Sequence, residues 1–202
     1  MNRLLVFGKY DINEVKLSDT SLGGIITLET KKIPHSFGRA VSKRIDKTQT
    51  SIIERLINKV MRSGQGKRKL SGKYIRGRGG TGKKIQATQI VERAFELVHE
   101  QTKQNPLQVL IQAIENSGPR EDTTRIKRGG ISYTVSVDVS PRKRVDESIK
   151  NIALAAFSNS FNKKVSAHEA LAKEIILSAK EDNASFSIKR RDEVERIAKS
   201  SR

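Results

Sequence analysis

Apolar residues recur at helical spacing in six parts of the chain, and this pattern predicts six α-helices. The clearest part, residues 51–64, places six apolar side chains on one helical face before a terminating Gly64. Asn105–Pro106 and Ser140–Pro141 each combine a capping residue with a first-turn proline, which marks the start of a helix. The other five helices are expected over residues 85–103, 106–117, 141–158, 166–180 and 189–200.

The period of the pattern changes to two between the third and fourth of these helices. Residues 120–138 alternate around Gly129–Gly130, a pair that suits a tight two-residue turn because glycine tolerates positive φ. Pairing across this turn places Ile126 opposite Tyr133 and predicts a β-hairpin with one apolar face and one basic, hydroxyl-rich face. Two strands alone are marginal in water, so we expect this ribbon to lean on helices or on a partner.

Residues 1–50 show little helical periodicity and carry several glycines, a proline and a basic stretch. We therefore interpret them as an extended arm that wraps a partner. The predicted fold is mainly α: a bundle of about six helices with one inserted β-hairpin arm and an extended N-terminal segment.

The strongly positive net charge of the chain indicates a polyanionic partner. The chain has 40 Lys and Arg against 22 Asp and Glu, a formal net charge of +18. Such a chain repels itself unless a polyanion neutralises it, and nucleic acid is the usual polyanion for a protein this basic. A membrane surface is the alternative, but no leucine-rich or aromatic face opposes the basic residues. With neither a signal-peptide core nor a membrane-length apolar run, we expect a soluble cytoplasmic protein without membrane partners.

The most basic stretch is residues 62–84, in which seven glycines accompany the cations and no acid occurs between Glu54 and Glu92. We expect a flexible cationic loop there. A run of charge can be only a solvated face, but two further basic segments, 31–50 and 120–144, flank the same bundle. Recognition of RNA through phosphates and 2′-hydroxyls needs contacts spread in this way. The loop residues expected to contact RNA are Arg62, Lys67, Arg68, Lys69, Arg76, Arg78, Lys83 and Lys84.

The stretch GRGGTGKK at residues 77–84 matches most of the P-loop pattern, which makes a nucleotide hydrolase the alternative function. Lys84, however, stands where a Ser or Thr hydroxyl should hold Mg²⁺. The residues before the loop are too charged for a buried strand, and one hairpin provides no parallel sheet. We therefore predict that the chain is not an enzyme and takes no cofactor or small-molecule substrate.

The remaining candidate groups for chemistry are few. No cysteine is present, and the three histidines, His35, His99 and His168, have no second ligand at metal spacing, so no metal site is predicted. The adjacent acids Glu121–Asp122 are expected to pair with Arg120 and Arg125 at the base of the hairpin rather than to act on a substrate.

The chain closely resembles the universal small-subunit ribosomal protein number seven family, in its archaeal/eukaryotic form. The resemblance covers most of the chain from about residue 31, but it gives no residue-by-residue match for 66–82. It rests on five stretches that occur in order: IPHSFGRAVSKR (33–44), IIERLINKVMRSG (52–64), TKQNPLQVLIQAIENSGPREDTTRIKRGG (102–130), VDVSPRKRVDESIKNIA (137–153) and DEVERIAKSSR (192–202).

The resemblance implies a helical bundle with a β-ribbon arm that binds the 3′ major domain of small-subunit rRNA. It also implies that the protein nucleates assembly of the subunit head beside neighbouring ribosomal proteins, near the tRNA exit site and the mRNA path. Gly129–Gly130 would face the tRNA and mRNA, with Arg202 as a further contact. The rRNA contacts implied by position are His35, Arg39, Lys43, Arg44, Arg62, Arg120, Arg125, Lys127, Arg128, Arg142, Lys143 and Arg144.

These expectations divide the chain into two parts. Residues 1–50 form an N-terminal basic extension, and residues 51–202 form a helical RNA-binding domain with the β-hairpin at 120–140.

Overall fold

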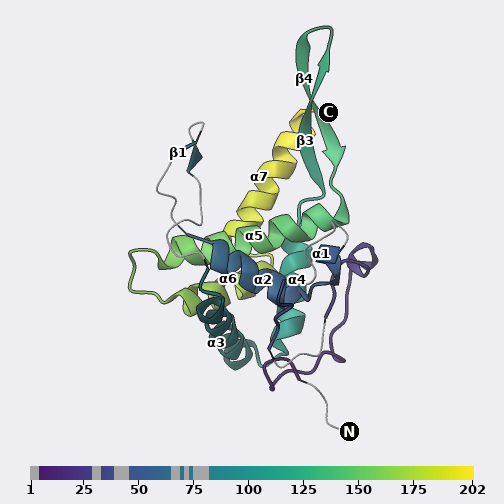
Figure 1. Ribbon diagram of the computed structural model, residues 1–202. Helices are drawn as coiled ribbons and strands as arrows, with labels where there is room; N and C mark the ends of the chain where they lie inside the picture. The colour runs from purple at the N-terminus through teal and green to yellow at the C-terminus, as the bar shows by residue number, and fades with distance from the viewer. Residues whose placement is uncertain (1–4, 29–32, 39–45, 65–68, 71–72, 75–81) are drawn as a thin grey trace.

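The computed structural model describes residues 5–28, 33–38, 46–64, 69–70, 73–74 and 82–202. These residues form a helical bundle from which one β-hairpin projects, which confirms the predicted fold class (Figure 1). The elements in chain order are η1 (Thr20–Leu22), α1 (Asp46–Gln49), α2 (Ile52–Arg62), β1 (Lys69–Leu70), β2 (Lys73–Tyr74), α3 (Lys84–Thr102), α4 (Pro106–Ser117), β3 (Glu121–Arg128), β4 (Ile131–Asp138), α5 (Pro141–Ser160), α6 (Ala167–Ala179) and α7 (Phe186–Ser200).

Helix α6 lies at the centre of the bundle and packs against α3, α4 and α5. Its Leu171 and Ile175 are fully buried, as the sequence pattern predicts. The expected capping box is present, because the Ser166 hydroxyl accepts from the Glu169 amide and the Glu169 carboxylate accepts from the Ser166 amide. The capping box fixes the residue at which α6 begins, and so which of its side chains face the core.

The four residues Ile52, Ile53, Leu56 and Ile57 of α2 are all buried against α3 and α5. The predicted apolar face of this helix is therefore confirmed at its first two turns.

The N-terminal segment differs from the expected wrapping arm. Val6, Phe7, Tyr10 and Leu22 are buried members of the main core, and the rings of Phe7 and Tyr10 meet Phe95 of α3 edge-to-face. The segment shows no periodicity because it packs through irregular turns, among them a bridge between Val6 and Tyr10. Residues 5–28 are thus part of the bundle, and the interpretation as an arm that wraps a partner is wrong for them.

The connection between α2 and α3 agrees with the expected loop at 62–84 to within one residue at each end. Helix α2 runs to Arg62 and α3 begins at Lys84, and the antiparallel pair β1–β2 lies between them. Gly77 and most other residues of the loop lie outside the described part of the chain. The last helix begins earlier than predicted, at Phe186, because the Ser185 hydroxyl caps it by accepting from the Ile188 amide.

The hairpin β3–β4 has the predicted register, with Ile126 opposite Tyr133 and Thr124 opposite Val135. Gly129 and Gly130 have φ of 57° and 83°, which a two-residue turn with two left-handed positions requires. The ribbon stands clear of the bundle, and α7 rises beside its base (Figure 1). It therefore leans on a helix at one end only.

Candidate nucleic-acid interface

The projecting half of the ribbon presents cations to solvent. Arg125 and Lys127 are exposed on β3, and neither contacts a carboxylate in the described part of the chain. Arg128 closes β3 beside the turn, and its side chain lies outside the described groups. Unpaired cations on a protruding element can approach a phosphate backbone without breaking any contact within the protein.

The other face of the ribbon is apolar and also faces solvent. Ile131 is 60% exposed and Tyr133 50%, while Val135 and Val137 are each more than a third exposed. The expectation that the ribbon leans on helices or on a partner is therefore met by α7 only at the base, and the outer half is left for a partner.

The base of the ribbon is fixed by ion pairs, though not by those expected. Lys143 Nζ binds Asp122 Oδ2 at 2.5 Å, and Arg202 pairs with Glu121. Burial alone would raise the pKa of Asp122, but the hydrogen bond from Lys143 brings it below the ordinary value. The predicted pairing with Arg120 and Arg125 is wrong, because Lys143 at the start of α5 and the C-terminal Arg202 pair with these acids instead.

Arg144 is placed differently from its neighbours in the sequence. It is only 7% exposed, and its Nη1 donates to Asp19 Oδ2 at 2.9 Å. Hydrogen bonds from Ser21 and Arg144 lower the pKa of Asp19 from 3.8 to about 2. The Arg144 Nε is buried and has no hydrogen-bond partner among the described residues. Arg142 and Lys143 are accessible to solvent, although Lys143 is paired with Asp122, so of the three consecutive cations only Arg144 is buried.

Lys83 and Lys84 also separate into two roles. Lys83 is exposed before α3, whereas Lys84 Nζ binds the buried Glu54 Oε1 at 2.5 Å. Burial would raise the pKa of Glu54, but the bonds from Lys84 and Ser36 bring it below the ordinary value. Lys84 therefore ties α3 to α2 and is not presented to solvent as Lys83 is.

The P-loop comparison loses further support from this ion pair. A lysine that starts α3 and neutralises Glu54 is not directed at a triphosphate. Both sheets among the described residues are two-stranded and antiparallel, so no parallel strand precedes the loop. The described residues also contain no group of three or more His, Asp or Glu arranged to hold a metal ion.

One stacked aromatic pair, of which one ring is exposed, was not predicted from the sequence. The rings of His35 and Phe37 stack with centroids 4.2 Å apart, and Phe37 is 79% exposed with a positive φ of 51°. An exposed ring, stacked on a second ring and next to a basic stretch, is the kind of platform on which an unpaired base can stack. The only sequence signal is one aromatic two residues after the histidine.

Two further predicted contacts lie at the ends of described elements. Arg62 ends α2 and is exposed, and Lys69 starts β1. The others, which lie outside the described residues, are Arg39, Lys43, Arg44, Lys67, Arg68, Arg76 and Arg78.

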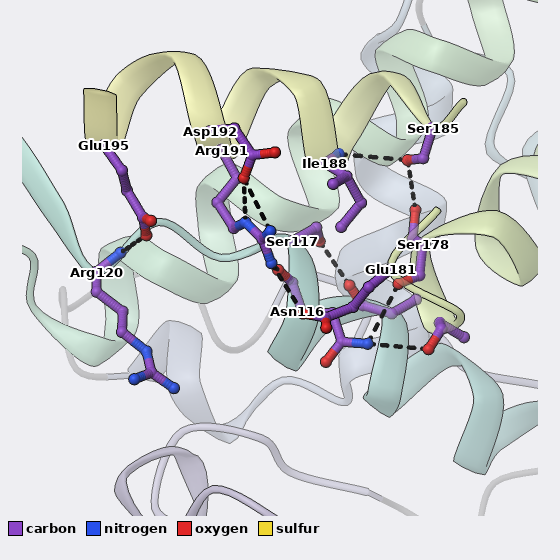
Figure 2. A network of polar contacts seen from close by, with 12 residues as sticks. Asn116, Ser117, Arg120, Ser178, Glu181, Ser185, Ile188, Arg191, Asp192 and Glu195 are labelled. Atoms are coloured by element: carbon purple, nitrogen blue, oxygen red, sulfur yellow. Dashed lines mark hydrogen bonds and ion pairs between the residues drawn. The ribbon is translucent and has the colours of Figure 1, made fainter. Parts of the chain in front are cut away.

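A polar network fastens α7 to the bundle beside the ribbon (Figure 2). Arg191 Nη1 donates to the Asn116 carbonyl at 2.6 Å and to Glu181 Oε1 at 3.0 Å. The Asn116 amide in turn donates to the Ala179 carbonyl at 2.9 Å. These bonds join the ends of α4 and α6 to the middle of α7. Further along α7, Glu195 Oε1 accepts from the Arg120 amide at 2.9 Å, which connects the helix to the ribbon.

The structure thus brings Arg120, Lys143 and Arg202 together around the root of the ribbon. Lys83 lies at the start of α3, beside α2, and is separate from this group. No helix in the described part of the chain is both long and apolar enough to cross a membrane.

The chain is similar to known proteins over nearly its whole length. Residues 29–202 match the family model described as ribosomal protein S7p/S5e. Three archaeal proteins named small ribosomal subunit protein uS7 are similar to the chain. The one from Methanothermobacter thermautotrophicus is 45% identical over 97% of this chain and 98% of its own. Those from Archaeoglobus fulgidus and Methanosphaera stadtmanae are 46% and 42% identical, over 98% and 96% of this chain and 95% and 97% of theirs.

Proposed function

Since this chain belongs to the ribosomal protein S7p/S5e family, we propose that it is a non-catalytic structural constituent of the small ribosomal subunit, where it binds rRNA and contacts neighbouring ribosomal proteins. The observation that carries this proposal is the ribbon, which projects from the bundle (Figure 1) and whose exposed Arg125 and Lys127 make no ion pair with the described residues. Its place of action is the cytoplasmic ribosome.

The finer role follows from the resemblance. The protein binds the 3′ major domain of the small-subunit rRNA and nucleates assembly of the subunit head. Its ribbon tip at Gly129–Gly130 and its C-terminal Arg202 lie near the tRNA exit site and the mRNA path. The open position of the turn at the far end of the ribbon supports this placement (Figure 1).

Within the proposed RNA-binding surface (the footprint), cations that are open to solvent differ in role from those that are already paired with a buried or partly buried carboxylate. Those with exposed or accessible charged groups form the contact surface, chiefly on the ribbon and around its root. Lys84 and Arg144 act on RNA indirectly, because their charges hold α3 and the N-terminal segment in place. The basic residues of the loop at 62–84 and of the stretch 35–44 remain in the footprint on the strength of their charge. Release of counterions from the RNA supplies most of the affinity.

The test is binding of the full chain to a fragment of the 3′ major domain of small-subunit rRNA at several salt concentrations. We expect the affinity to fall steeply with salt. Replacing Arg125, Lys127 and Arg128 together by Ala should weaken binding and reduce the salt slope by roughly one unit for each phosphate that the variant no longer neutralises. Helix content, measured by circular dichroism, should stay the same.

The matched control replaces three exposed lysines outside the footprint, Lys173, Lys180 and Lys189, by Ala, which removes the same charge. If both triple variants lose the same affinity, net charge and not the ribbon is responsible. Binding that ignores salt, or ATP turnover that Lys83→Ala abolishes, would contradict the proposed function itself.

A further inference from the structure

A polar hollow of about 680 Å³ opens at the root of the ribbon. Three segments supply its walls: residues 18–20 at the start of η1, residues 115–120 between the end of α4 and β3, and residues 138–144 from the end of β4 into α5. The charged residues of the lining are Asp19, Glu115, Arg120, Asp138 and Arg144. Its volume falls in the range of small-ligand sites, about 300–1,000 Å³. Unlike most such sites, its lining is largely polar and carries both signs of charge.

The inner wall is held by bonds within the protein. Asp19 is bound by Arg144 at 2.9 Å and by Ser21 at 2.6 Å. Glu115 Oε1 accepts the backbone amides of Ser18 and Asp19 at 2.9 and 3.0 Å. These groups shape the hollow, but each already has partners, so the wall is rigid before any ligand arrives.

Two charged groups at the strand ends are unengaged. The Arg120 guanidinium and the Asp138 carboxylate are exposed, and neither makes a hydrogen bond or ion pair within the described part of the chain. Figure 2 shows the Arg120 side chain pointing away from α7, while only its backbone amide is tied to Glu195. The backbone beneath them is fixed, since the Val139 amide donates to the Arg120 carbonyl at 2.8 Å.

A ligand for this hollow must satisfy a free cation and a free carboxylate together. A simple phosphate would meet three carboxylates, and a metal ion would meet two guanidinium groups. A nucleotide unit carries both complements: its phosphate matches Arg120, and the amino and imino groups of its base match Asp138. Among the four bases, only guanine has two adjacent N–H donors on its Watson–Crick edge, which a carboxylate accepts together.

We propose that this hollow receives one unstacked guanine of the bound RNA, with Asp138 accepting from its N1–H and 2-amino groups and Arg120 holding the adjoining phosphate. This rests on the proposed rRNA-binding function. The hollow lies at the base of the ribbon, where Arg120 precedes β3 and Asp138 ends β4, so RNA that follows the ribbon passes its mouth. Specific RNA recognition generally uses such splayed-out bases, because their edges are free of pairing.

The experiment probes the complex of the full chain and the rRNA fragment with kethoxal, which reacts at N1 and the 2-amino group of unpaired guanines. We expect the wild-type chain to protect one guanine that becomes reactive in the complex of Asp138→Asn, because an amide offers one acceptor in place of two. The variant should bind the fragment roughly tenfold more weakly. Asp182→Asn is the matched control; this exposed residue can still accept from the Ala184 amide, and its complex should resemble wild type.

Identical protection in the wild-type and Asp138→Asn complexes would overturn the proposal while leaving the proposed function intact. If no salt-dependent complex forms at all, the proposed function fails, and the hollow is then judged by a second arm without RNA. In that arm the full chain is titrated with GMP and with IMP, which lacks the 2-amino group, and chemical shifts of the residues around Asp138 are followed by NMR. A stronger response to GMP that Asp138→Asn removes supports the guanine site; equal or absent responses overturn it.

Discussion

At the scale of single residues, the cations of this chain have two roles: some are exposed to solvent, and others are buried or partly buried against a carboxylate of the fold. Their positions in the sequence do not distinguish these roles. Arg142, Lys143 and Arg144 are consecutive, yet only Arg144 is buried, against Asp19. The reason is geometric: neighbours on a helix point in different directions, and the N-terminal segment covers just one of them. The same contrast separates Lys83 from Lys84.

The Asp19–Arg144 pair should make stability depend on pH. The folded pKa of Asp19, about 2, lies below its ordinary value of 3.8, so its contribution is complete well above pH 3.8 and is lost as the pH falls toward 2. At neutral pH, Asp19→Asn should lower the free energy of unfolding by about 1–3 kcal/mol, since the buried guanidinium loses its carboxylate. Urea denaturation from pH 7 to 2 measures this. A wild-type-to-variant difference that does not shrink below pH 3.8 would refute the assignment.

Lys83 and Lys84 allow a paired test. Lys84→Ala leaves Glu54, which is 4% exposed, without its cation and should lower the free energy of unfolding by about 3 kcal/mol. Lys83→Ala should change stability by less than about 0.5 kcal/mol, because the residue is exposed, and should weaken RNA binding instead. Thermal denaturation and RNA titration of both variants separate the two roles, and equal losses of stability would show that the ion pair does not hold α3.

At the scale of elements, the ribbon and α7 depend on each other. Two strands are marginal alone, and α7 supports the base of β3 while Arg191 fastens α7 to the ends of α4 and α6. The position of the ribbon is therefore set at its base, by hydrogen bonds that hold α7 in the bundle, and not at its tip.

Loss of the Arg191 side chain should loosen this support. Arg191→Ala removes its bonds to Asn116 and Glu181 and should lower the free energy of unfolding by about 1–3 kcal/mol. Amide hydrogen exchange should speed up in α7 more than in α3. Arg190→Ala is the control, because the ion pair that Arg190 makes among the described residues is with Glu193, one turn away on the exposed side of α7, and its loss should cost about 0.5 kcal/mol or less. Unchanged exchange in α7 would mean that apolar packing alone holds the helix.

Sequence patterns predicted the elements better than the contacts between them. The helix starts at Ser140–Pro141 and Ser166 and the turn at Gly129–Gly130 follow from local chemistry, so they could be predicted directly. The partners of Glu121 and Asp122 could not, because Arg202 and Lys143 come from distant parts of the chain. The polar hollow at the ribbon's root was missed for the same reason.

At the scale of the whole molecule, the N-terminal segment belongs to the fold. A chain with a net charge of +18 has a strong internal repulsion, and its core must offset this. Residues 5–28 extend that core over α3 and α4 through buried side chains and through bonds such as that of the Lys16 amide to Gln108. The segment also supplies Asp19 to the root of the ribbon.

A core substitution tests this. Leu22 is 1% exposed, so Leu22→Ala should lower the free energy of unfolding by about 2–5 kcal/mol, as should Leu107→Ala in α4, where the leucine is equally buried. Chemical denaturation of both variants gives the comparison. A cost below about 0.5 kcal/mol for Leu22 alone would restore the view of residues 1–50 as an appended arm.

The two-stranded ribbon has a consequence for the chain before it meets RNA. Both β3 and β4 are edge strands, and each carries unpaired backbone groups beside an exposed apolar face. Such edges are templates for pairing with a second copy, and cations along them discourage that pairing by repulsion. Arg125 and Lys127 therefore have a role before the protein binds RNA as well as after. In free copies of the chain, the repulsion between these cations opposes edge-to-edge pairing of the ribbons.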